Sequence, residues 1–161
     1  MLSMIRIEDS DFRPLEEFPL KWRWTDSRWN KLPPDALNFI RPFTDEKARD
    51  LLQYSLMFSN HTGLFESHFE NISRIVAPDD SSKVRQWLLD HAPDKNQMVI
   101  VSWDHHHAVL VRWDVVCDYW DDFCYPASDE VTVWPQSEEW ALMYLHHEEF
   151  VFGIWRGSGA A

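Results

Sequence analysis

Five short apolar runs follow one another in the second half of the chain, and they limit the folds that the sequence can adopt. The runs are rich in valine, isoleucine and aromatic residues, which favour β-strands, and polar residues or proline bound each of them. They cover residues 98–103, 107–113, 131–134, 140–145 and 150–155. Short polar segments join the first two runs and the last two, so the sequence predicts two β-hairpins within a mostly antiparallel five-stranded sheet.

The first half of the chain has helical spacing instead. Thr44 is a favourable N-cap, and the acidic residues after it suit the positive end of a helix dipole. Apolar residues then recur every three or four positions, as they do on the buried face of a helix. The predicted helical segments are a short turn at 35–40, a helix from Thr44, a helix with Phe65, Phe69 and Ile72 on one face, a helix capped by Ser81 or Ser82 that runs to His91, and a short helix capped by Asp114 with Val116, Tyr119, Trp120 and Phe123 on one face.

Helices in the first half and strands in the second predict an α+β fold, in which N-terminal helices precede the five-stranded sheet and one short helix lies between its strands. The chain has 161 residues, which is enough for one domain and short for two. We assign residues 1–156 to a single domain and residues 157–161, which are small, to a flexible tail. We find no secretory signal pattern and no apolar run approaching about 18 residues, so we expect a cytoplasmic protein.

Glycine content and net charge exclude two large classes of function. Four glycines occur, and two of them lie in the tail, so the body of the chain cannot form a glycine-rich phosphate-binding loop. Neither a P-loop nor a dinucleotide-binding fingerprint fits this sequence, and we expect no cofactor. The net charge of −12 repels nucleic-acid phosphates and attracts a basic protein partner.

The two cysteines are unsuited to a disulfide. Cys117 and Cys124 would lie about 10 Å apart along a helix, and on opposite faces of a strand. Both belong to a segment rich in aspartate and aromatic residues, where negative charge and burial raise the pKa of a thiol. We therefore expect two reduced thiols in the core and no cysteine nucleophile.

Histidines cluster in the predicted turns of the two hairpins. His105 and His107 belong to one turn, and His146 and Glu148 belong to the other. If the two turns met at one edge of the sheet, these four side chains could bind zinc and activate a water for hydrolysis. Successive residues of a strand point to opposite faces and turns are polar in any case, so ordinary turn chemistry is the competing interpretation.

The segment 119–130 alternates aromatic and acidic residues densely. This composition is typical of a docking surface, where aromatic rings supply contact area and carboxylates face basic groups of a partner. It is also typical of a helix with an aromatic core face and an acidic solvent face. A basic, tryptophan-rich segment at 22–31 could pack against it within the molecule. The candidate partner-binding residues are Trp120, Asp121, Asp122, Tyr125, Asp129 and Glu130.

Aromatic and acidic residues recur in a particular order between residues 97 and 155. Trp103 and Trp113 stand at the ends of paired strands, the 119–130 segment follows, and aromatic and aliphatic residues then flank a His-His-Glu-Glu sequence in 140–153. This order resembles small bacterial proteins of uncharacterised families, including some immunity partners of secreted toxins. The resemblance implies a single-domain α+β protein that has no cofactor and blocks a toxin by binding it. It carries no residue roles.

Three hypotheses for the function follow from the sequence. The acidic charge, the ten tryptophans and the lack of cofactor motifs favour a non-catalytic protein-binding domain, such as an immunity or inhibitor protein with a basic partner. The first alternative is a metal-dependent hydrolase that uses the two histidine-bearing turns. The second alternative is an accessory subunit of a larger assembly.

Overall fold

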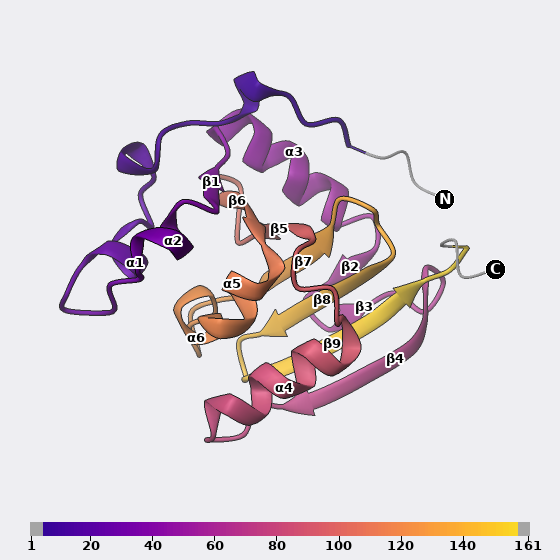
Figure 1. Cartoon of the computed structure of the whole chain (residues 1–161). Coiled ribbons are helices and arrows are strands. Elements are labelled where there is room, and N and C mark those ends of the chain that lie inside the picture. Colours follow the sequence, from indigo (N-terminus) through magenta and orange to yellow (C-terminus); the bar gives the residue numbers. More distant parts are fainter. Residues whose placement is uncertain (1–4, 158–161) are drawn as a thin grey trace.

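The computed structural model describes residues 5–157, and its centre is a seven-stranded antiparallel sheet (Figure 1). The strand order is β1-β6-β5-β7-β8-β9-β4, and a separate small hairpin consists of β2 and β3. The strands are β1 (Ile40–Pro42), β2 (Ser59–Asn60), β3 (Gly63–Leu64), β4 (Phe69–Val76), β5 (Met98–Ser102), β6 (Ala108–Arg112), β7 (Val131–Pro135), β8 (Trp140–Leu145) and β9 (Glu149–Trp155).

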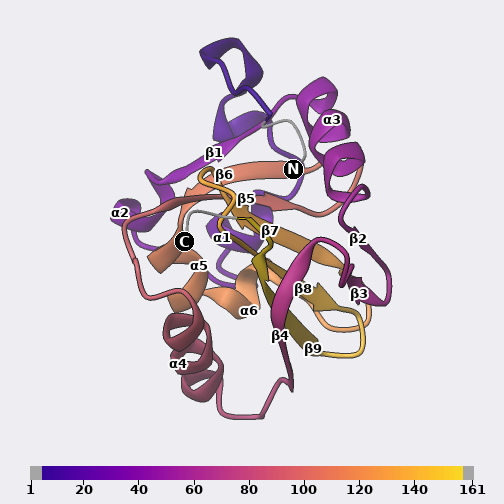
Figure 2. The same cartoon turned by 90° about the vertical axis from the view of Figure 1, so that its right-hand side faces the viewer.

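Helices cover both faces of the sheet, so the described chain has three layers (Figure 2). One face packs against α3 and the β2–β3 hairpin, and the other packs against the remaining five helices. Every residue of β7 and β8 is consequently buried, whichever face its side chain occupies. The helices are α1 (Trp22–Thr25), α2 (Pro34–Leu37), α3 (Asp45–Ser55), α4 (Ser81–His91), α5 (Trp113–Asp118) and α6 (Trp120–Phe123), with two 3-10 turns at Asp9–Asp11 and Leu15–Glu17.

The α+β class and the antiparallel sheet are confirmed, but the predicted number of five strands is wrong. The five predicted strands form the centre of the sheet, and the N-terminal half adds one strand at each edge. β1 pairs with β6 and begins at Ile40, the last residue of the predicted 35–40 turn. β4 pairs with β9 and occupies much of the segment predicted as the second helix.

A β-bulge explains why β4 has the sequence pattern of a helix. Asn71 has a left-handed φ of 53°, and the register with β9 shifts between Glu70 and Ser73. The bulge adds one residue to β4, so Phe69 and Ile72 pack into the same core despite their odd separation. A spacing of three therefore arises here from an irregular strand, although it is also the spacing of a helix face.

The two long helices begin close to the predicted positions. The Thr44 hydroxyl accepts a hydrogen bond from the Lys47 N–H at 3.3 Å, which confirms Thr44 as the N-cap of α3. The cap of α4 is Asp80, whose carboxylate accepts from the Ser82 N–H at 3.0 Å, and not one of the two predicted serines.

The short helix predicted after residue 114 is two helices in the structure. α5 begins one residue earlier, at Trp113, so Asp114 lies in its first turn and is not the cap. Tyr119 has φ −124° and ψ 31°, which interrupts the helix and separates α5 from α6. The 119–130 segment that follows the break contacts the N-terminal part of the chain, where Trp24 donates to the Asp122 carbonyl and Arg23 pairs with Asp129.

Most of the tryptophans belong to the core. Six of the ten are buried, and Trp29 is the one exposed tryptophan, with 59% of its surface accessible. Three buried indoles donate to main-chain carbonyls: Trp24 to Asp122, Trp103 to Phe123 and Trp113 to Ala92. These side chains fill wide interior spaces and also satisfy carbonyls at the ends of α4 and α6.

Both cysteines are free and buried, as predicted. Burial raises the pKa of each thiol, and the neighbouring carboxylates Asp118 (for Cys117) and Asp129 (for Cys124) raise it further. Of the predicted tail, residues 158–161 lie outside the described residues. Within 5–157, every helix is too short or too polar to cross a membrane.

Candidate functional site

The tryptophan-rich N-terminal segment packs against the 119–130 segment. Arg23 lies in α1, and its guanidinium forms a bidentate ion pair with Asp129, with Nη1–Oδ2 and Nη2–Oδ1 distances of 2.6 and 3.1 Å. Both side chains are less than one tenth exposed. The Asp129 carboxylate also accepts from the Tyr125 N–H at 2.8 Å. Internal packing of the basic segment, which the sequence left open, is therefore what the structure shows.

Aromatic rings surround the buried guanidinium of Arg23. Its central carbon lies 4.2 Å from the ring centroid of Tyr125, 5.5 Å from that of Trp22 and 5.8 Å from that of Trp103. These distances are within the range of cation–π attraction. The arginine is thus held by a carboxylate and by ring faces together, in an environment that water barely reaches.

On the outer side of this ion pair lies a cluster of three aromatic rings. The ring centroids of Trp22 and Trp29 are 5.0 Å apart. The ring centroid of Tyr125 lies 5.7 Å from that of Trp22 and 6.3 Å from that of Trp29. The side-chain amide of Asn30 donates to Asp122 at 2.7 Å, which brings the carboxylate beside the residue that follows Trp29. We call the set Trp22, Trp29, Tyr125, Asp121 and Asp122 the aromatic–acidic surface.

The Asp122 carboxylate is electrostatically unfavourable in the isolated chain. Burial raises its pKa, the hydrogen bond from Asn30 lowers it, and the neighbouring charge of Asp121 raises it again. The net pKa lies above the ordinary value, and no lysine or arginine among the described residues offsets the charge. A cation supplied from outside would stabilise this carboxylate.

The six predicted partner-binding residues do not form one surface. Asp121, Asp122 and Tyr125 belong to the aromatic–acidic surface, but Asp129 is buried beneath it, and both of its carboxylate oxygens accept hydrogen bonds from Arg23.

The other two predicted residues make internal contacts elsewhere. Trp120 donates its indole N–H to the Ser81 carbonyl at 3.2 Å and packs its ring against Phe150. Glu130 pairs with His146 at 2.9 Å. Trp29 was missing from the predicted set. Its exposure could have been predicted from the sequence. Trp29 lies among turn-forming and basic residues at 26–31, and no apolar periodicity there indicates a buried face.

The two histidine-bearing turns lie at the same end of the sheet but are not neighbours. β7 separates the β5–β6 hairpin from the β8–β9 hairpin, so β5 and β8 are about 10 Å apart. His107 pairs with Asp104 at 2.8 Å, whereas His146 pairs with Glu130.

The other proposed metal ligands have local roles or none. Glu148 occupies a left-handed turn position, with φ 64°, and His105 is exposed. Within residues 5–157, no three side chains of histidine, cysteine, aspartate or glutamate lie together as a metal site. The structure therefore does not bring His105, His107, His146 and Glu148 to one ion.

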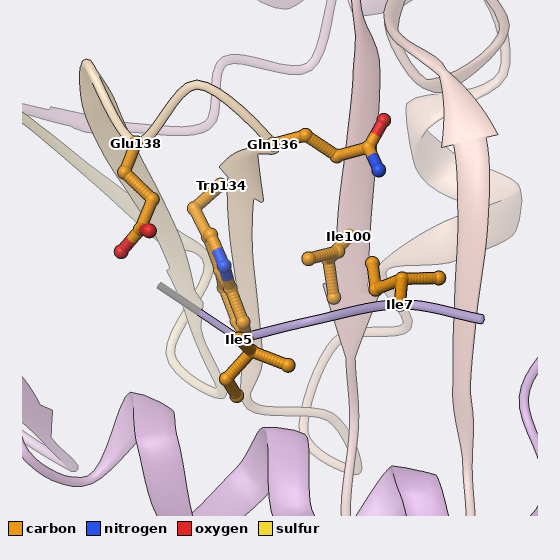
Figure 3. Close-up of a pocket in the computed structure, with 6 residues that line it drawn as sticks. All are labelled: Ile5, Ile7, Ile100, Trp134, Gln136 and Glu138. Atoms are coloured by element: carbon orange, nitrogen blue, oxygen red, sulfur yellow. The ribbon is translucent and has the colours of Figure 1, made fainter. Parts of the chain in front are cut away.

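A small cavity lies under the N-terminal segment, between β5 and β7 (Figure 3). Its volume is about 50 Å³, whereas ligand pockets are roughly 300–1,000 Å³. Figure 3 shows Ile5, Ile7 and Ile100 on its apolar side, with the carboxylate of Glu138 at its margin. Glu138 accepts a hydrogen bond from Tyr54, so this carboxylate already has an internal partner. At about 50 Å³ the cavity is too small for a substrate site.

Comparison with known proteins finds no matching family model, no matching curated protein and no matching solved structure. The resemblance to immunity proteins therefore stays a prediction.

Proposed function

We propose that this chain is a non-catalytic protein-binding domain that holds a basic partner on its aromatic–acidic surface. The observation that carries the proposal is the position of Trp29, which is 59% exposed, packs against two other rings and precedes Asn30, whose side-chain amide donates to the Asp122 carboxylate. Exposed tryptophan and tyrosine are enriched among the residues that dominate binding energy at protein interfaces.

The neighbouring rings restrain Trp29 before any partner arrives. Trp22 and Tyr125 pack against it, and Tyr125 is itself fixed over the buried Arg23 guanidinium. A restrained aromatic side chain loses little conformational entropy on binding, so more of its contact energy appears as affinity. The Arg23–Asp129 ion pair beneath therefore serves as the support of the proposed surface.

The charge distribution favours a basic partner. Ten of the fifteen lysines and arginines form ion pairs with acidic residues of the same chain. Most of the basic side chains are therefore already paired with carboxylates of this chain. The net charge of −12 comes from the excess of acidic over basic residues. A field of this sign accelerates encounter with a basic protein at low ionic strength. A nuclease toxin is a basic protein of this kind, because it has to hold nucleic acid.

Salt-gradient capture from native lysate tests the proposal. Immobilised wild-type chain is compared with Trp29→Ala and with Asp121→Asn/Asp122→Asn. Two controls match these changes on the opposite layer: Met57→Ala removes another exposed apolar side chain, and Glu46→Gln/Asp50→Asn removes the same charge from α3.

We expect one basic protein that elutes as salt screens the charges, and that elutes at lower salt from the surface variants than from the controls. Equal elution from all variants would refute this surface as the binding site. A partner that stays bound at every salt concentration would instead indicate the accessory-subunit alternative.

A further inference from the structure

The interior of the protein shows which ligand its aromatic and acidic residues hold together. Arg23 is bound inside by stacking on Tyr125 at 4.2 Å and by two hydrogen bonds from its guanidinium to Asp129. This combination suits arginine in particular, because a guanidinium is planar, stacks on rings and donates two parallel hydrogen bonds to a carboxylate.

The same kinds of side chain occur on the outer side, where no arginine of residues 5–157 lies over the ring of Trp29. Trp29 and Tyr125 supply rings, and Asp122 supplies a carboxylate that is hydrogen-bonded to Asn30, the residue after Trp29. Asn30 bonds to Oδ2 of Asp122, and within the described part of the chain no donor bonds to Oδ1. Asp121, at the preceding position, adds a second carboxylate that is exposed.

We propose that the aromatic–acidic surface binds an arginine side chain of the partner, stacked on Trp29 and paired with Asp122. This inference rests on the proposed function and specifies the group that is recognised. Lysine fits less well, because its compact ammonium is more strongly hydrated and cannot form a planar, bidentate pair with the carboxylate. The partner is accordingly a protein that presents an exposed arginine on a basic face.

Nuclear magnetic resonance with short peptides tests the arginine site directly. The probes are the acetylated, amidated tripeptides Gly-Arg-Gly, Gly-Lys-Gly and Gly-citrulline-Gly, the last being the uncharged analogue of arginine. The indole N–H signal of Trp29 is assigned by its loss in Trp29→Phe, and the Asn30 side-chain amide reports on Asp122. We expect both signals to shift saturably with the arginine peptide.

The expected order of affinity is arginine above lysine above citrulline, with lysine about threefold to tenfold weaker than arginine. Asp122→Asn and Trp29→Ala should each weaken arginine binding, whereas the control Glu46→Gln/Asp50→Asn should bind as the wild type does. The Asn30 amide provides the readout where Trp29 is absent.

Three results would overturn the arginine site: equal shifts with arginine and lysine, unchanged binding by Trp29→Ala, or no shift at Trp29 with any peptide. None of these refutes the proposed function, which is judged by the elution of a captured basic protein from the same variants. If that protein elutes at the same salt concentration from all variants, the aromatic–acidic surface is not its binding site. This conclusion holds for any result of the peptide titrations.

Discussion

The Arg23–Asp129 ion pair makes the strongest prediction for stability. Replacing Arg23 with methionine keeps an unbranched stem but removes the guanidinium, and so leaves a carboxylate buried without its cation. The two side chains are 7% and 8% exposed and share hydrogen bonds of 2.6 and 3.1 Å. Removing one partner of such a pair costs about 3–5 kcal/mol. This is a large fraction of the roughly 5–15 kcal/mol that stabilises a typical domain.

Urea unfolding followed by tryptophan fluorescence measures this loss. Thermal unfolding gives a second readout. A loss of about 1 kcal/mol lowers the melting temperature of a domain of this size by about 2–4 °C, so we expect a fall of about 6–20 °C. The matched control is Arg85→Met, because the Arg85–Asp118 pair has the same 2.6 Å distance but side chains that are 43% and 42% exposed. That change should cost less than about 1 kcal/mol.

A double variant separates the lost pair from the stranded charge. Arg23→Met/Asp129→Asn should be less unstable than the sum of the single variants, because asparagine leaves no unpaired negative charge in the interior. If Arg23→Met costs no more than Arg85→Met, burial does not determine the strength of this pair, and our account of the support under Trp29 is wrong.

Three further predictions concern stability, reactivity and pH. Gly153→Ala should destabilise the fold by about 1–3 kcal/mol in urea unfolding, because a Cβ there would lie 2.9 Å from the Cβ of Phe69; an unchanged midpoint would show that β4 and β9 can separate freely. Cys117 and Cys124 should resist a thiol reagent at neutral pH and react in urea, since both are buried with raised pKa values; rapid labelling of the folded chain would contradict this. Asp122→Asn should raise stability at pH 7, because the folded pKa of this acid lies above its unfolded value. The gain should vanish as the pH falls below about 3.9, where the acid is protonated in both states, and a gain that persists there would refute the assignment.

The sequence alone determined the centre of the sheet. Runs of β-branched and aromatic residues bounded by turns give strands wherever they lie, so all five predicted strands are present, with ends within two residues of the prediction. The cap at Thr44 was also predictable, because a cap depends on a hydroxyl and an N–H three residues apart. These features need only neighbours along the chain.

Tertiary structure decided the edges of the sheet. β1 and β4 come from the N-terminal half and join opposite ends of a sheet made by the C-terminal half. β1 has only three residues and therefore a weak pattern of its own, and the bulge at Asn71 gives β4 the spacing of a helix. Pairing with β9, which local sequence does not encode, selects the strand.

The candidate site divides in the same way. The alternation of aromatic and acidic residues at 119–130 indicated a region of interest, and three of its six predicted residues lie on the aromatic–acidic surface. Asp129 is the buried acid of this segment because it pairs with Arg23, which lies 106 positions away in the sequence. Composition indicated both segments, but only the folded chain pairs Asp129 with that arginine and joins Asp122 to Asn30, the neighbour of the exposed Trp29. Burial and ion pairing depend on contacts between segments that are remote in sequence.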